Sequence, residues 1–498
     1  MGEPKASLHT LICFEVASTR MKEYDLIVIG SGSAMNIVEP MIQDNPNIRI
    51  AVIDKDEPGG ICLTRGCIPS KILLYPAELV RKIEEARELG IDTQIKKISF
   101  EFVMERMRKL IYTDIDQIRE GLTSSKNIDY YHEPAEFIAP YTMRVRGSEI
   151  KSKMIFLCIG SKTTIPQIKG LDKISYHTSD SAFKMKQLPE SIAIVGGGYI
   201  AAEFGHFFAS MGSKVTIIGR NPQFVPEEEP EVSALAKKVL SRHINIITNH
   251  EVKEVREISS GLKELIALER KTGKTVTVTA REIMIASGRG PITDILHPEK
   301  SGIKTTPDGW IAVNEYLETS QPGIWALGDA DGKYLFKHVA NYESAIVYYN
   351  AILKRRVKVD YHAVPHGIFT YPEIAGVGMK EQEAISKYGA DKVLIGHHKY
   401  EDTAKGEALN VKDYFVKVIV EADTERILGA HIIGPEATTL IHEIIPLMHT
   451  PQQTYRPIRD MMHIHPALSE VVDRAFQSFM PPEHYHHTIE HSHQMVEA

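Results

Sequence analysis

The sequence predicts an α/β fold with two separate units of parallel sheet, each flanked by helices. Three observations lead to this prediction. At 498 residues the chain exceeds one simple core, and about three domains are expected. A short apolar run, a glycine-rich turn and a helical stretch follow one another twice, beginning near Tyr24 and near Ser191. In both places a second apolar, β-branched run comes about twenty residues later, which is typical of strand–helix–strand units.

The first unit begins with YDLIVIGSG at residues 24–32, and its second strand, IRIAVIDKD, contains Asp54. Glycines at this turn let backbone N–H groups approach a pyrophosphate at a helix N-terminus, and the acid accepts from a ribose hydroxyl. We therefore expect Gly30, Gly32 and Asp54 to bind a dinucleotide. Met35 stands where a third glycine is usual, so helix and strand should pack differently here.

The second unit, SIAIVGGGYIAAEFGHFFASMGSKVTIIGRN, places Gly196, Gly198 and Ala201 after an apolar strand. The downstream stretches MIFLCIGSKTTIP and IMIASGRGPIT also echo each other as strands that run into glycine-rich turns, and the second supplies Gly288. One such glycine pattern is a weak signal, whereas two framed copies indicate two nucleotide sites, one for each of two cofactors.

The second unit lacks a ribose-binding acid. Where an NAD site places Asp or Glu, this chain has Gly219 followed by Arg220. An arginine offers a bidentate partner to a 2′-phosphate, and the missing carboxylate removes repulsion. The sequence therefore favours NADP(H) over NAD(H). The alternative is that Arg220 merely lies on a solvated turn.

Two of the four cysteines, Cys62 and Cys67, stand five positions apart in GGICLTRGCIPSK. On a regular helix their Cα atoms would be about 8.6 Å apart, and a disulfide tolerates at most about 7 Å. We expect Gly60 and its glycine neighbours to give an irregular turn before the helical stretch SKILLYPAELVRKIEEARELG, with both sulfurs at its N-terminus, where the thiolate is favoured. No further Cys/His pair suggests zinc, so a redox-active pair is favoured. Cys13 and Cys158 are expected to be inert thiols.

GGICLTRGCIPSK resembles the redox-disulfide signature of the class I flavin-dependent disulfide reductases, which include dihydrolipoamide dehydrogenase, glutathione reductase, mycothione reductase and mercuric reductase. TSQPGIWALGDA resembles the second flavin motif of this family. HGIFTYPEIAGVGMKE resembles the opening of its dimerisation domain, and HIHPALSEVVDRAF resembles its C-terminal catalytic segment. The resemblance extends from residue 22 to about residue 478, with the motifs in the family's order.

The resemblance implies an FAD enzyme in which Cys62 exchanges with substrate, Cys67 faces the flavin, and His465 is the acid–base group. Its further implied site residues are an ion pair beside the flavin, Lys71 with Glu203; a ribityl-binding acid, Asp329; and cofactor contacts at Gly60 and Ala135. The local sequence supports His465 independently. We expect Pro466 to be a first helical residue and Glu470 to reach back and orient the imidazole.

The architecture that the resemblance implies is two Rossmann-like domains followed by an α+β dimerisation domain. The FAD-binding domain would comprise residues 22–165 and 292–360, and the NAD(P)-binding domain residues 166–291. Residues 361–480 would form the interface of a homodimer, in which His465 reaches the partner's Cys62. Residues 1–21 are expected to be a disordered leader, and residues 481–498 a histidine-rich tail that is solvated and disordered rather than metal-binding.

Two enzyme functions fit these residues: a dihydrolipoyl dehydrogenase-like enzyme, and an NADPH-dependent reductase of a small disulfide of the mycothione, bis-γ-glutamylcystine or glutathione type. Arg220 favours the second. Mercuric reductase needs a C-terminal cysteine pair, and no cysteine follows Cys158. The hypothesis from a different class is a redox-silent flavoprotein scaffold, against which the retained Cys62, Cys67 and His465 argue.

Composition and charge limit the classes of partner that we expect this protein to bind. The net charge of −7 is spread along the chain without a basic stripe, so we expect no nucleic-acid partner. No run of about 18 apolar residues occurs, so we expect no membrane partner. Four cysteines in 498 residues do not make a disulfide-stapled secreted protein, and a cytoplasmic location is expected. No metal site is expected.

Overall fold

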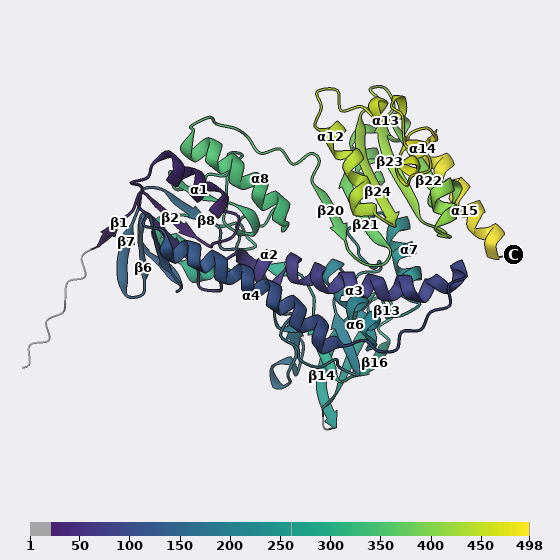
Figure 1. Cartoon of the computed structure of the whole chain (residues 1–498), viewed down its shortest axis with the longest axis horizontal. Coiled ribbons are helices and arrows are strands. Elements are labelled where there is room, and N and C mark those ends of the chain that lie inside the picture. The colour runs from purple at the N-terminus through teal and green to yellow at the C-terminus, as the bar shows by residue number, and fades with distance from the viewer. Residues whose placement is uncertain (1–20, 260, 498) are drawn as a thin grey trace, which may run out of the picture.

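The computed structural model describes residues 21–259 and 261–497, which form three parts (Figure 1). The predicted leader, apart from Met21, lies outside the described residues. Each part is built on one main sheet: two parallel sheets of five strands and one antiparallel sheet of six. The α/β prediction with two similar units and a third, different one is confirmed.

The first part is a three-layer arrangement around a parallel sheet. Its strand order is β19 (Ile324–Ala326), β8 (Ile155–Leu157), β2 (Leu26–Ile29), β3 (Ile50–Ile53) and β4 (Ile128–Tyr131). One face packs on helices α1 (Met35–Asp44) and α8 (Lys337–Val347). The other face packs on a second sheet of β1 (Lys22–Glu23), β7 (Ser148–Lys151), β6 (Thr142–Val145) and β5 (Ala135–Ala139). Strands β2, β3, β8 and β19 are buried throughout, as such layering requires, whereas the edge strand β4 is mostly only partly buried.

The second part repeats this plan. Its parallel sheet has the order β10 (His177–Thr178), β17 (Glu282–Ile285), β11 (Ser191–Val195), β12 (Lys214–Ile218) and β13 (Asn245–Ile247). Helices α6 (Tyr199–Met211) and α7 (Pro230–Leu240) cover one face. The antiparallel strands β14 (His250–Ser259), β15 (Leu262–Glu269) and β16 (Thr275–Ala280) cover the other.

The third part is an antiparallel sheet in the order β20 (Pro365–Ile368), β21 (Glu373–Gly378), β24 (Ile427–Gly434), β23 (Phe415–Glu421), β22 (Val393–Lys399) and β25 (Phe479–Met480). Helices α9 (Glu381–Tyr388) and α14 (Ser469–Ala475) pack against it. Short connecting elements complete the chain: β9 (Lys162–Thr163), β18 (Arg289–Gly290), α5 (Ser179–Ala182), α10 (Ala404–Ala408), α11 (Ala437–Leu440), α12 (Ile445–Met448) and α13 (Arg456–Asp460).

A buried lysine joins the second and third parts. Lys417 on β23 has a side chain that is 0% exposed, and its ammonium lies 2.9 Å from Glu229 and 3.0 Å from Glu231 at the start of α7. The ammonium also lies 2.7 Å from Glu381 at the start of α9. The three carboxylates thus replace the hydrogen bonds to water that the ammonium loses on burial, as a buried charge requires.

Helix α3 (Cys67–Glu85) continues from α2 (Gly60–Arg65) at the first part and runs over the second, and α4 (Phe100–Ser124) returns toward the first (Figure 1). Helix α3 packs on α6, and both belong to one apolar cluster. This crossing brings residues that follow the first glycine turn to residues that follow the second.

The prediction that the histidine-rich tail is disordered is wrong. Helix α15 (Pro482–Glu497) continues from β25, and Tyr485 on it is only 1% exposed within an apolar cluster of the third part. His486 of the same turn lies 2.7 Å from Glu381. Tyr485 and the partly buried Ile489 anchor this mostly polar segment on the third part, which composition alone does not reveal. Within the described part of the chain, no helix combines the length and the apolar character that a membrane span needs.

Candidate active site

The two closely spaced thiols lie on either side of a helix break. Helix α2 ends at Arg65 and α3 begins at Cys67, while Gly66 between them has φ −137° and ψ −121°. A Cβ atom on Gly66 would lie 2.8 Å from the backbone oxygen of Ile61, so only glycine fits this break. Both cysteines are free thiols.

The irregular turn is as predicted, but the position of Cys62 is not. Only Cys67 lies at the N-terminus of the long helix; Cys62 lies in the short helix α2 before it. The reason is that Gly59 and Gly60, at φ +108° and +73°, reverse the chain early and start a separate helical turn.

The two thiols differ in acidity. The hydrogen bond from Cys62, with help from the Lys71 ammonium, lowers the pKa of Cys67 to about 7 although burial opposes it. The same hydrogen bond, together with burial, raises the pKa of Cys62. Of the two thiols, Cys67 at the first position of α3 therefore loses its proton more readily.

An ion pair beside the thiols links the first and second parts. Lys71 on α3 donates to both carboxylate oxygens of Glu203 on α6, each at 2.8 Å. Glu203 is 5% exposed and also accepts from the backbone N–H of Phe369 at 3.0 Å. The ring of Phe369 lies 4.6 Å from the Lys71 ammonium. The structure thus brings together two residues that are 132 positions apart in the chain.

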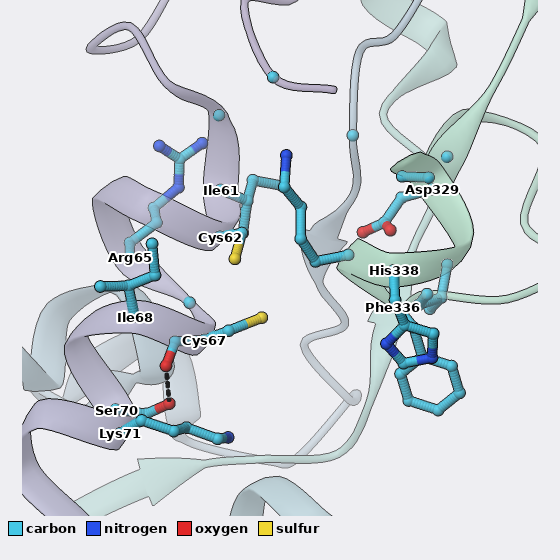
Figure 2. Close-up of a pocket in the computed structure, with 18 of the residues that line it drawn as sticks. Ile61, Cys62, Arg65, Cys67, Ile68, Ser70, Lys71, Asp329, Phe336 and His338 are labelled. Carbon is cyan, nitrogen blue, oxygen red and sulfur yellow. Dashed lines mark hydrogen bonds between the residues drawn. The ribbon is translucent and has the colours of Figure 1, made fainter. Parts of the chain in front are cut away.

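Both thiols open onto one large cavity of about 960 Å³ (Figure 2). Figure 2 shows the side chains of Cys62 and Cys67 on one wall, with Asp329, Phe336 and His338 across from them. The cavity adjoins a smaller one of about 60 Å³ that is lined by the first glycine turn, and the two share lining residues such as Gly32 and Gly60. Together they form an elongated space that runs from the glycine turn to the thiols.

The first glycine turn is built as predicted. A Cβ atom on Gly30, which has φ +98°, would lie 2.1 Å from the backbone oxygen of Cys158, so a side chain is excluded. Asp54 accepts from the backbone N–H and the hydroxyl of Ser31, at 2.9 and 2.6 Å. Asp54 and the buried Ala135 line the smaller cavity at the end remote from the thiols. Met35 opens α1 and packs against the apolar cluster under that helix, which contains Pro40.

Asp329 lies in a polar set that the sequence analysis identified only in part. It accepts a hydrogen bond from the hydroxyl of Ser161 and lies 3.9 Å from Arg289. Arg289 donates to Ser161 Oγ at 2.7 Å and to its backbone oxygen at 2.8 Å. Burial raises the pKa of Asp329. Ser161 and Arg289 were missed, although both follow strands at the paired glycine-rich turns that the sequence shows.

The second glycine turn has the same geometry as the first. A Cβ atom on Gly196 would lie 2.1 Å from the backbone oxygen of Ala286, as Gly30 does against Cys158. Gly198 caps α6, in which Ala201 is fully buried. The remaining predicted residues of this turn also lie here: Gly219 follows β12, and Gly288 has φ +106° next to β18.

Arg220 is exposed at the end of β12, and its backbone oxygen accepts from the guanidinium of Arg270 at 3.2 Å. Arg270 follows β15, and the two arginines together with Lys253 lower the pKa of Glu251. Sequence reasoning missed Arg270, because its position beside Arg220 depends on the β14–β15 hairpin.

His465 lies on the third part, outside the cavity of its own chain. Of the residues that the structure describes, those lining the cavity do not include His465. Its side chain is 70% exposed, and its Nδ1 lies 2.9 Å from Glu470 Oε1. The hydrogen bond from His465 and the backbone N–H of Ala467 lower the pKa of Glu470.

The prediction that Pro466 is a first helical residue is wrong, because α14 begins at Ser469. The second carboxylate oxygen of Glu470 accepts from the N–H of Ala467 at 3.1 Å. Glu470 therefore accepts a hydrogen bond from the backbone of the turn before the helix while it orients the imidazole of His465. Pro466 lies in that turn. The predicted contact of Glu470 with His465 is present.

Other charged side chains around the cavity carried no sequence signal. Arg65, which lies between the two cysteines in the sequence, is 2.6 Å from Asp56 and 3.4 Å from Asp180 on α5. His366 on β20 lies 2.8 Å from the buried Glu228, whose charge raises the pKa of the imidazole against the effect of burial. Lys337 at the start of α8 also lines the cavity. Each has partners that are distant in sequence.

Comparison with known proteins points to one family of oxidoreductases. The family model described as pyridine nucleotide-disulphide oxidoreductase matches residues 24–347, and the dimerisation domain of that family matches residues 364–476. A mycothione reductase of Mycobacterium tuberculosis is 33% identical over 470 residues, covering 91% of this chain and 99% of the relative. A dihydrolipoyl dehydrogenase of Synechocystis is 32% identical over 477 residues, with 91% and 98% covered.

A similar solved structure is the Cu(II) complex of the HOCl-induced flavoprotein disulfide reductase RclA from Escherichia coli. It has a TM-score of 0.81 and 27% identity, and the match covers 92% of this chain and 99% of that one.

Proposed function

The chain belongs to the pyridine nucleotide-disulphide oxidoreductase family, and on this basis we propose that it reduces a small disulfide with electrons from NADPH. It is an FAD-dependent disulfide oxidoreductase. The observation that carries the proposal is the pair of free thiols at the break between α2 and α3, one of them with a lowered pKa, on the wall of a large cavity.

The residues present fit FAD. The smaller cavity offers Asp54 and Ala135 to the adenosine end, and the partly buried Asp329 and the Lys71–Glu203 pair line the larger cavity near the thiols. When bound, FAD would pass two electrons between the nicotinamide and the Cys62–Cys67 pair. The ammonium of Lys71 favours negative charge at Cys67, and Glu203 fixes the position of that ammonium.

The thiol chemistry is ordinary exchange. The thiolate of Cys62 attacks one sulfur of the substrate disulfide, whose S–S bond breaks as a mixed disulfide forms and the first substrate thiolate leaves with a proton. The thiolate of Cys67 then attacks Cys62 Sγ and releases the second substrate thiolate. The Cys62–Cys67 disulfide is restored. The substrate has gained two electrons and one proton from the enzyme, and the second thiolate takes its proton from solvent.

His465 is the group we assign to these proton transfers. It takes the proton of Cys62 before attack and returns it to the leaving thiolate, and Glu470 stabilises the imidazolium. Because His465 is exposed and does not line the cavity of its own chain, we propose that it acts on the partner's Cys62 in a homodimer. The match of residues 364–476 to a dimerisation domain supports this.

The choice of NADPH rests on the end of β12. Arg220 follows Gly219, which stands where an acid would bind the ribose of NAD, and Arg270 donates to the backbone oxygen of Arg220. Two guanidinium groups at this position favour a 2′-phosphate. The residues that bind the rest of the nucleotide would be Gly196, Gly198 and the N-terminus of α6.

Replacing Arg220 by methionine is expected to raise KM for NADPH about tenfold, since a charge-assisted hydrogen bond contributes about 1.5 kcal/mol or more. KM for NADH should stay unchanged, because NADH lacks the 2′-phosphate. Steady-state kinetics with each nucleotide measure both values. Lys214→Met, at the other end of β12, is the control and should alter neither. An equal change of KM for both nucleotides would contradict the assignment.

A panel of substrates under both nicotinamides tests the function itself. We expect reduction of at least one among mycothione, bis-γ-glutamylcystine and glutathione disulfides, faster with NADPH than with NADH. The second candidate, oxidation of dihydrolipoamide, is favoured by the 32% identity to a dihydrolipoyl dehydrogenase. It predicts faster turnover of dihydrolipoamide with NAD⁺. Turnover of none of these, with FAD bound, would favour a scaffold protein instead. A reducing cytoplasmic location is consistent with the free thiols.

A further inference from the structure

Lys337 places a positive charge at the N-terminus of a helix, which is itself partially positive. It is the first residue of α8, and a helix N-terminus carries a partial positive charge that repels a cation. Its ammonium donates to the hydroxyl of Ser33 at 2.9 Å, and no carboxylate of the described residues forms an ion pair with it. Lys337 nevertheless lines the cavity that holds both thiols. Its charge is therefore available to an anion that forms in this cavity.

A chain of hydrogen bonds fixes the ammonium. Ser33 accepts from Lys337 and donates to Asn341 Oδ1 at 3.0 Å, one turn further along α8. The same oxygen of Asn341 also accepts from Asn36 at 3.2 Å. The glycine turn of the first part and α8 thus hold Lys337 between them. The lysine is positioned by the protein rather than by solvent.

The fixed ammonium lies close to the start of α2. Ser33 directly follows Gly32, and a Cβ atom on Gly60 would lie only 2.8 Å from the Cα atom of Gly32. Cys62 is two residues beyond Gly60 in the same short helix. Electrostatic attraction to Lys337 lowers the pKa of Cys62, against the larger raising effects of Cys67 and of burial.

We propose that Lys337 is the cation that stabilises the Cys62 thiolate once the cysteine pair is reduced. This rests on the proposed function, in which Cys62 must lose its proton before it attacks a disulfide. Lys71 favours negative charge on Cys67, and Lys337 favours it on Cys62. The proton leaves Cys62 for the imidazole of the partner's His465, and no electron moves in this step. Lys337 is a positioning charge that makes a half-buried thiol a nucleophile.

Alkylation of the reduced holoenzyme tests this without any disulfide substrate. The protein is reduced with dithiothreitol, freed of it, and treated with iodoacetamide between pH 5 and pH 10. Trypsin cleaves after Arg65, so Cys62 falls on the peptide DEPGGICLTR and Cys67 on GCIPSK. Mass spectrometry then gives a separate rate for each thiol. The pH at which Cys62 reaches half of its maximal alkylation rate is its midpoint. In Lys337→Met this midpoint should rise by about one pH unit, and below the midpoint Cys62 should react about tenfold more slowly.

Three comparisons complete the design. Lys337→Arg keeps the charge and should keep the midpoint of Cys62. Lys333→Met is the control, because the Lys333 ammonium lies 4.5 Å from the ring of Tyr361, and it should alter neither thiol. The midpoint of Cys67 should move less than that of Cys62 in Lys337→Met.

An unchanged Cys62 midpoint in Lys337→Met would overturn the proposal. This holds even if the substitution changes the reduction potential of the flavin. If that variant loses FAD, the same titration on Lys337→Gln decides, since glutamine keeps a donor for Ser33 without the charge. The readout is independent of the proposed function: a wild-type enzyme that turns over none of the disulfides still gives both midpoints.

Discussion

Cys62→Ser is expected to lower turnover with every disulfide or dithiol substrate by at least about three orders of magnitude, as loss of a catalytic nucleophile does. A serine hydroxyl stays protonated at neutral pH and forms no disulfide, so neither the mixed disulfide nor the Cys62–Cys67 bond can arise. Steady-state assays with each substrate of the panel measure the loss. The FAD content should equal that of the wild type, because the cavity keeps its shape.

Two controls make this result specific. NADPH-driven reduction of ferricyanide needs FAD but no thiol, and it should persist in Cys62→Ser. Cys13→Ser removes one of the two thiols outside the pair and should leave disulfide turnover unchanged. Persistence of full disulfide turnover in Cys62→Ser would remove the chemical basis of the proposed function.

Mixing two inactive variants should restore activity if His465 serves the partner subunit. Cys62→Ser lacks the nucleophile, and His465→Ala lacks the acid–base group, so each homodimer is inactive. In a mixed dimer one site loses both groups, and the other keeps Cys62 from one chain and His465 from the other. Random pairing of equal amounts yields half mixed dimers with one working site each, hence about a quarter of the wild-type rate.

The measurement is turnover after co-expression of the two variants with different affinity tags and purification through both tags, which isolates the mixed dimer. That species should have about half of the wild-type rate, since one of its two sites works. The matched control pairs Cys62→Ser with Cys67→Ser, whose mixed dimer keeps no complete cysteine pair and should stay inactive. An inactive Cys62→Ser/His465→Ala dimer would place both groups in one chain, contrary to the exposed position of His465.

The parts of the site that could be predicted are local in sequence. Gly30 and Gly196 follow apolar strands, and only glycine allows the close approach of the neighbouring strand's end. Cys62 and Cys67 are five residues apart, as are His465 and Glu470, so few backbone conformations connect them. The Lys71–Glu203 contact, by contrast, spans 132 residues and came only from the resemblance.

The parts that could not be predicted depend on tertiary contacts. Ser161 and Arg289 meet at Asp329 from three separate segments. Helix α2 escaped prediction because the backbone of two glycines, rather than a side-chain pattern, sets where it begins. The order of the tail depends on Tyr485 and Ile489, which pack on the third part, in a stretch whose composition is mostly polar.

Lys417 has a mechanical consequence for the catalytic cycle. Rotating the second part away from the third would pull the ammonium from Glu229 and Glu231 and leave charges stranded out of water. Breaking a buried ion pair in this way costs about 3–5 kcal/mol. We therefore expect no hinge between these two parts during turnover. The faces that these two parts contribute to the cavity are therefore already in place before ligands arrive, and the release of products should not depend on the two parts separating.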